Sequence, residues 1–228
     1  MYSASIFTFY GDNTSLVLGD MKDTLLLFLA GFGIAVVIAQ PLGAWLGHIH
    51  RGSFLAINTA NIGRALPSLA VIAIFVGVLG IGFWNNVVAL VVLAVPVMIT
   101  NTFIGVDGVE RDLTQAARGM GMRGWDVFWR VELPLALPLV FAGMRTAALY
   151  VMATTPLAAF TGGSGLGEII ANQASYKFEG VVAASILIAV LAFAADGLFA
   201  LLQRYATPRA LRSGGGGIEA KGSALEAT

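Results

Sequence analysis

Long stretches without a charged side chain constrain this 228-residue chain more than any other feature of its sequence. No formal charge occurs between Asp23 and Arg51, and 42 uncharged residues separate Arg64 from Asp107. A helix of about 20 apolar residues crosses a bilayer core that is about 30 Å thick. Only 11% of the residues are charged, against about 25% in soluble domains. The sequence therefore predicts a membrane protein built from helices.

Five membrane spans account for these stretches and give an all-α fold. The 42-residue stretch is too long for one span, and residues 81–86 (IGFWNN) supply a turn that divides it. Pro134 suits the first position of the fourth helix. The expected transmembrane domain covers residues 25–203, with spans at residues 25–46, 66–82, 87–104, 134–156 and 181–202.

The positions of Lys and Arg predict the orientation, because these residues favour the cytoplasmic side. They gather after the first, third and fifth spans, and the other side holds only Lys22 and Lys177. The N-terminus is therefore expected outside, with residues 1–24 external. No cleaved signal peptide is expected, because the N-terminus lacks a basic n-region before the first apolar run. The C-terminus is expected inside, with a disordered, glycine-rich cytoplasmic tail at residues 204–228.

Composition argues against several classes of function. The zero net charge gives no basic field for nucleic acid, and the absence of cysteine excludes disulfides and zinc–thiolate sites. The sequence shows no catalytic triad, paired catalytic carboxylates or metal cluster, so we expect neither an enzyme nor a cofactor in this chain. His48 and His50 have no third ligand nearby and are expected to be solvated or interfacial.

The polar segment between the third and fourth spans, residues 106–133, is the most informative part of the chain. Asp112 and Gln115 predict the start of a short helix through a variant capping box, and glycines at 119 and 121 interrupt it. Trp125, Phe128 and Trp129 follow at helical spacing and share one face. This face either lies on the lipid interface or docks into a groove on another protein.

The spacing within this segment resembles a loop shared by the permease subunits of bacterial ABC importers. Gln115-Ala116-Ala117 is followed after three residues by Gly121, and after nine more by Val131-Glu132-Leu133-Pro134. The family has glutamate where this chain has Gln115, which lacks the charge. In the family the loop is a coupling helix seated on the ATPase subunit. The resemblance implies ATPase contacts through Gln115, Ala116, Ala117, Gly121, Trp125, Phe128 and Trp129. We call residues 106–133 the coupling segment.

Other stretches are similar to the osmoprotectant branch of this family, which imports glycine betaine, carnitine, choline or proline betaine. They are residues 64–70, 119–122, 131–138 and 162–167. The methionine branch shares the five-span plan and remains an alternative. The resemblance implies location in the bacterial inner (plasma) membrane. The implied partners are two ATPase subunits that hold ATP and Mg, a second permease subunit (a copy or a homologue) and an external substrate-binding protein.

Several polar or glycine residues of the spans are candidates for the translocation path. Arg145 lies near the expected membrane midplane, where it either pairs with Asp196 or meets the carboxylate of a zwitterionic solute. Helix packing competes with a path-lining role at Asn101, Thr155 and Pro156. The glycine-rich stretch at residues 162–167 lacks Gly-Lys-Ser/Thr and binds no ATP. It is either a flexible external turn or a gate hinge that includes Gly163 and Gly165.

Two functions from other classes remain open. A self-sufficient secondary carrier places ion-coupling residues and broken helices at the midplane, usually within inverted repeats, and no clear repeat is present here. A membrane scaffold anchored by the aromatic face of the coupling segment would transport nothing. The sequence does not decide which solute is carried.

Overall fold

All regular structure in the described residues, which are 2–50, 58 and 66–206, is helical in the computed structural model. No strand occurs in these residues. The elements are α1 (Tyr2–Asp12), α2 (Thr14–His48), α4 (Ser68–Leu79), α5 (Phe83–Asp107), α6 (Arg111–Gly119), α7 (Gly124–Val127), the π-helical turn η1 (Phe128–Glu132), α8 (Leu133–Thr154), the 3₁₀ helix η2 (Thr155–Thr161), α9 (Leu166–Ala171) and α10 (Gln173–Ala206).

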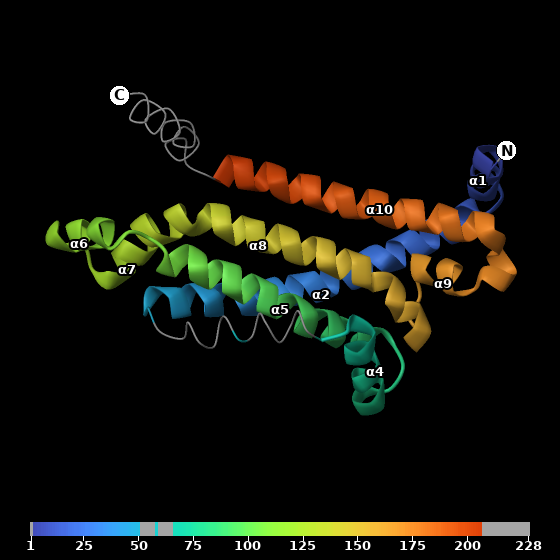
Figure 1. Cartoon of the computed structure of the whole chain (residues 1–228), viewed down its shortest axis with the longest axis horizontal. Coiled ribbons are helices and arrows are strands. Elements are labelled where there is room, and N and C mark those ends of the chain that lie inside the picture. The colour runs from blue at the N-terminus through green and yellow to red at the C-terminus, as the bar shows by residue number, and fades with distance from the viewer. Residues whose placement is uncertain (1, 51–57, 59–65, 207–228) are drawn as a thin grey trace, which may run out of the picture.

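Four helical runs within the described residues are long and apolar enough to cross a membrane. They are α2, α5, the run Gly124–Thr161 that contains α8, and α10. They lie side by side along the long axis of the molecule (Figure 1), with α5 packed on both α2 and α8, and α8 packed on α10. The main core lies between them, where Phe32, Leu90, Met98, Ala147 and Met152 are buried.

The segment expected to form the second span differs from the other four. Its helix, α4, has 12 residues, which rise about 18 Å at 1.5 Å per residue and fall short of a bilayer core of about 30 Å. It runs across the long helices near the start of α5 (Figure 1). Residues 51–57 and 59–65, including Arg51 and Arg64, lie outside the described residues, as does the tail from residue 207.

The turn expected at residues 81–86 is displaced. Gly80 and Gly82 have φ of 78° and 147°, a region that glycine adopts readily, and they complete the turn before Phe83. Helix α5 therefore begins earlier than expected, and Asn85 and Asn86 are buried in its first turn. The external segment expected at residues 1–24 is also helical, and Tyr10 Oη donates to Ala183 O at 2.8 Å.

Two glycines allow α2 to approach α5 closely at the ends of these helices nearest the coupling segment. A Cβ on Gly43 would lie 2.8 Å from Ile99 O, and one on Gly47 would lie 2.7 Å from Val106 Cβ. Both distances are shorter than van der Waals contact. The absence of a side chain at these positions therefore fixes how close α2 and α5 can come.

We predict that Gly43→Leu destabilises the helix bundle, because the added side chain forces the α2–α5 contact apart. Overpacking of this kind costs about 1–3 kcal/mol. The matched control is Gly33→Leu on the same helix, where an added Cβ meets nothing within 4 Å. Thermal unfolding in detergent should show a lower melting temperature for Gly43→Leu than for Gly33→Leu. Equal melting temperatures would contradict the close contact.

Candidate functional site

Helix α6 presents an exposed face at one end of the molecule. Leu113, Gln115, Ala116 and Met120 are exposed, whereas Ala117 is buried. The predicted capping box is wrong: α6 begins at Arg111 after Glu110, and no side chain caps it. Asp112 instead lies in the first turn, where its carboxylate favours the positive end of the helix dipole.

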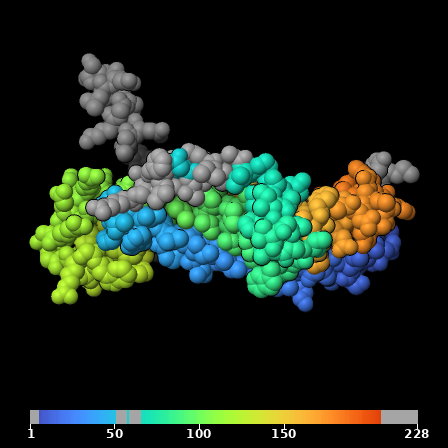
Figure 2. Space-filling view, turned by 90° about the horizontal axis from the view of Figure 1, so that it is seen from below, coloured from blue at the N-terminus to red at the C-terminus, as the bar shows by residue number. Residues whose placement is uncertain are grey.

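A tight turn joins α6 to α7, so that the coupling segment folds into two short helices. Gly121 has φ of 87°. The amides of Met120 and Met122 donate to Ala116 O and Ala117 O at 3.0 and 3.2 Å, which satisfies two of the last carbonyls of α6. Helix α6 packs on α7 and η1. Figure 2 shows these elements as one block at an end of the elongated molecule.

The three aromatic rings of the segment contact one another. Ring centroids lie 5.7 Å apart for Trp125 and Phe128, 5.6 Å for Trp125 and Trp129, and 5.2 Å for Phe128 and Trp129. Phe128 is buried, whereas both tryptophans are exposed. With Pro41 and Trp45 of α2 they line an apolar groove of about 520 Å³. The coupling segment therefore exposes residues both on α6 and in the aromatic cluster.

Both histidines pair with carboxylates, which the sequence did not indicate; His48 is half-buried, and His50 is exposed as expected. His48 Nδ1 lies 2.5 Å from Glu132 Oε2, and His50 Nδ1 lies 2.8 Å from Asp107 Oδ1. Glu132 is completely buried, and a buried carboxylate needs a polar partner. Among the described residues no group of three or more His, Cys, Asp or Glu side chains forms a potential metal site.

The glycine-rich stretch at residues 162–167 forms a turn whose two ends are hydrogen-bonded to other helices. Thr161 Oγ1 donates to Asn86 Oδ1 at 2.7 Å, and the Leu166 amide donates to Thr24 Oγ1 at 2.9 Å. A Cβ on Gly165, where φ is 123°, would lie 2.7 Å from Thr24 Oγ1. The two ends of the loop are therefore attached to α2 and α5.

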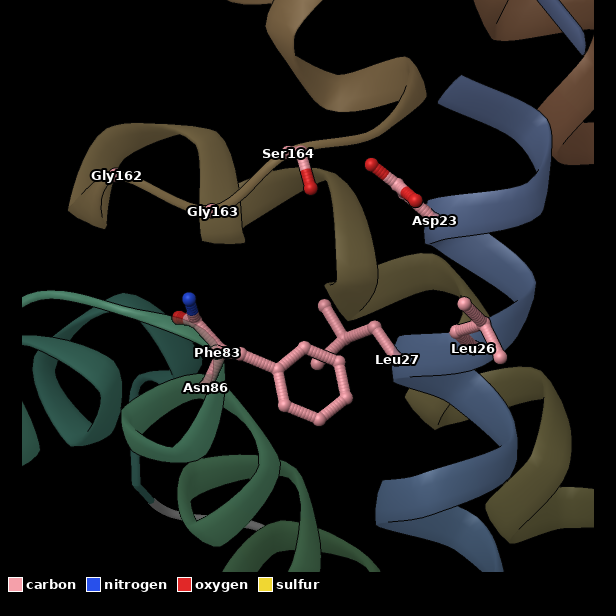
Figure 3. Close-up of a pocket in the computed structure, with 8 residues that line it drawn as sticks. All are labelled: Asp23, Leu26, Leu27, Phe83, Asn86, Gly162, Gly163 and Ser164. Carbon is pink, nitrogen blue, oxygen red and sulfur yellow. The ribbon is translucent and has the colours of Figure 1, made fainter. Parts of the chain in front are cut away.

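A cavity of about 160 Å³ opens beside this loop (Figure 3). Asp23, Asn86 and Ser164 point into it, and the ring of Phe83 and the side chain of Leu27 lie on the opposite side. Gly163 also lines the cavity. Both glycines singled out in the sequence are closely packed: a Cβ on Gly163 would lie 2.9 Å from Ala158 O, and one on Gly165 would meet Thr24 of α2.

Arg145 and Asp196 form an ion pair between α8 and α10. Arg145 Nη2 donates to Asp196 Oδ2 at 2.6 Å, and Arg145 Nε donates to Asp196 Oδ1. The two parallel bonds match a guanidinium to a carboxylate. Of the two alternatives for Arg145, the structure shows the pair.

The remaining path candidates make contacts inside this chain. Asn101 Nδ2 donates to Val97 O at 2.8 Å, and a Cβ on Gly143 of α8 would overlap the Asn101 side chain. Thr155 is buried and donates to Met152 O at 2.7 Å. Pro156 lies in the first turn of η2, next to Gly167. These three residues therefore contribute to packing between and within helices.

The sequence of this chain matches a known protein family. Residues 31–207 match the model of the binding-protein-dependent transport system inner membrane component. The chain belongs to this family of inner-membrane transport components. The permease is therefore a transport subunit rather than an enzyme, and the coupling segment lies entirely within the matched region.

Individual relatives extend over nearly the whole permease. It is 34% identical to the glycine betaine/carnitine/choline transport system permease protein OpuCB of Bacillus subtilis, over 91% of this chain and 96% of the relative. It is 31% identical to the carnitine transport permease protein OpuCB of Listeria monocytogenes, with the same coverage. A chain of the MetNI methionine ABC transporter, solved in inward-facing conformations, has the same fold, with a TM-score of 0.72 and 20% identity over 86% of this chain and 98% of that one.

Sequence reasoning missed the partners of Glu132, Asp107, Asn86 and Thr24. All four contacts join residues that are far apart in the sequence, and none follows a recognisable spacing. The one available signal was Glu132 itself, an acidic residue at the edge of an expected span.

We predict that breaking the Arg145–Asp196 pair destabilises the permease. Arg145→Met or Asp196→Leu alone leaves one charge between apolar helices and should lower the melting temperature in detergent. The double variant removes both charges and should regain most of the loss. Single variants as stable as the wild type, or a double variant no better than the weaker single variant, would contradict a pairing role.

Proposed function

We propose that the permease forms half of the translocation pathway of an ATP-driven, binding-protein-dependent importer of osmoprotectants such as glycine betaine, carnitine or choline. The observation that carries this proposal is the coupling segment, whose glutamine-alanine-alanine, glycine and leucine-proline residues have the spacing of ABC importer permeases. The similarity to relatives named for these solutes, over about nine tenths of the chain, supports the choice of substrate.

The assembly requires other subunits. Two ATPase subunits, which bind ATP and Mg, would seat the coupling segments, and a second permease subunit would complete the pathway. An external substrate-binding protein would deliver the solute. The permease itself carries no cofactor in this proposal.

The proposed topology has five spans, with residues 1–24 outside and the tail from residue 204 in the cytoplasm. The distribution of Lys and Arg supports it. The four long helices are long and apolar enough for four crossings, and the span expected at residues 66–82, which contains α4, would supply the other. The coupling segment then lies in the cytoplasm and the cavity beside Gly163 lies at the outer surface.

Within the coupling segment we assign the ATPase contact to the exposed face of α6, which includes Gln115 and Ala116. Ala117 and Phe128 are buried and hold the two short helices together, and Gly121 makes the turn between them. Trp125 and Trp129 are exposed on the aromatic face, where they contact either the ATPase or the lipid interface. At the outer end, Gly163 and Gly165 belong to the proposed gate region, and Asn101, Thr155 and Pro156 support it through helix packing.

The direct test is uptake by the purified assembly. The permease, tagged and purified with its partners from native membranes, is reconstituted into vesicles with the binding protein. Radiolabelled choline, carnitine or glycine betaine should enter only when ATP and Mg²⁺ reach the ATPase side. Uptake of methionine alone would move the assignment to the methionine branch. Uptake by this chain alone, driven by an ion gradient, would contradict the importer assignment.

We predict that Ala116→Glu removes the ATPase from the purified assembly, because the longer, charged side chain blocks the α6 contact. Its control is Ala174→Glu, another exposed alanine, at the opposite end of the chain's fold. Co-purification of the ATPase should fall about tenfold or more, which corresponds to about 1.4 kcal/mol of binding free energy. Undiminished co-purification would exclude the α6 face.

The aromatic face is tested in the same assay with Trp125→Asp and a control, Trp84→Asp, which also replaces an exposed tryptophan. Loss of the ATPase only with Trp125→Asp assigns the aromatic face to the ATPase. Retention of the ATPase with both variants assigns that face to the lipid interface.

A further inference from the structure

The two histidines of the chain both lie at the end of α2 and together reach both ends of the coupling segment. His48 is the last residue of α2, and His50 follows two residues later. His50 pairs with Asp107, the last residue of α5, and His48 pairs with Glu132, the last residue before α8. Residues 107 and 132 are the points where the segment leaves one long helix and enters the next. Figure 1 shows α6, α7 and the end of α2 gathered at the same end of the molecule.

The inner pair, His48 with Glu132, is surrounded by packed side chains. Glu132 is completely buried, and its Oε1 has no hydrogen-bond partner in the described part of the chain. The His48 ring packs against Phe128, with centroids 5.3 Å apart and planes at 65°. A Cβ on Gly124, the first residue of α7, would lie 3.9 Å from His48 Nε2. His48 therefore contacts η1 through both its polar and its apolar edges.

The local backbone accounts for the direction of Glu132. The Leu133 amide donates to Phe128 O, the five-residue bond of a π turn. The extra residue of such a turn rotates the helix that follows by about 100° relative to an uninterrupted α-helix. Glu132, the last residue of this turn, faces His48 on α2. π turns of this kind occur frequently at functional sites.

A buried pair of this kind is poor evidence for stability alone. Apolar residues of similar volume often stabilise a core as well as, or better than, a buried ion pair. What a polar pair adds is a directional bond between two specific atoms, which fixes how two elements sit against each other. The contacts at Gly43 and Gly47 already fix the same end of α2 on α5. The histidine pairs add the start of α8 to this unit.

We propose that His48 and His50 are positioning residues that hold both ends of the coupling segment on α2. A displacement of the segment by the ATPase then moves α2 together with α5 and α8. Without the histidine pairs, the covalent chain alone would pass the displacement to α5 and α8. We call the two histidine–carboxylate pairs the clamp. This inference rests on the proposed function for its transport readout, but the clamp is a property of this chain.

The test separates positioning from folding with four variants. His48→Phe keeps a ring against Phe128 but leaves Glu132 without its partner, and its instability is expected. The double variant His48→Phe with Glu132→Leu removes both polar groups and should fold as well as the wild type. His48→Asn places an amide nitrogen near the position of Nδ1 and should restore the bond. His50→Phe removes the outer, partly exposed pair and should have a smaller effect.

The first readout is the number of ATP molecules hydrolysed per solute imported by the reconstituted assembly. The double variant should raise this number several-fold while its melting temperature matches the wild type, and His48→Asn should stay near the wild-type value. A well-folded double variant with wild-type coupling would overturn the proposal.

The second readout does not depend on transport. Hydrogen–deuterium exchange of residues 107–132 in the purified permease should be faster in the double variant and unchanged in His48→Asn. Unchanged exchange in the double variant would refute the clamp even if the importer assignment holds. A wild-type assembly that imports none of the tested solutes, with exchange as predicted, would refute the proposed function and leave the clamp standing.

Discussion

The close packing of α2 on α5 at Gly43 and Gly47 is the contact on which the arrangement of the coupling segment depends. It brings the end of α2, with its two histidines, beside the end of α5 and the start of α8. The segment between α5 and α8 is only about 25 residues long and has few buried residues of its own. It therefore takes its position from its contacts with the ends of α2, α5 and α8. Buried Glu132 and Phe128 are the points at which that position is set.

The two ends of the molecule differ in how their residues are exposed and bonded. At the coupling end, short helices expose an apolar and polar face on α6 that a partner can cover. At the other end, the loop at residues 162–167 is bound to α2 and α5 through Thr24 and Asn86. Between them, the bilayer requires that backbone groups be satisfied within helices. The ion pair of Arg145 with Asp196 neutralises two charges on apolar helices that lipid would exclude.

The helical class, the family resemblance and the ring cluster of the coupling segment could be predicted from the sequence, because each depends on local spacing. Uncharged stretches identify apolar helices, and a three-to-four-residue spacing places Trp125, Phe128 and Trp129 together. The partners of Glu132 and Asn86 were beyond reach, because a hydrogen bond between residues more than 70 positions apart depends on how helices cross. The start of α5 was misplaced for a different reason: glycines at 80 and 82 complete the turn, so the asparagines that seemed to form it lie in the helix.

The central claim is that the coupling segment and the neighbouring ends of α2, α5 and α8 move as one body. The chain contains no cysteine, so two introduced cysteines are the sole labelling sites in the purified permease before it is assembled with its partners. Labels at the exposed residues Leu113 of α6 and Leu42 of α2 report the distance across this body by pulsed electron paramagnetic resonance. In the reconstituted assembly, this distance distribution should stay the same with and without ATP, while the distance between the Leu113 labels of two permease subunits changes. A change in the Leu113–Leu42 distance upon ATP binding would contradict the account.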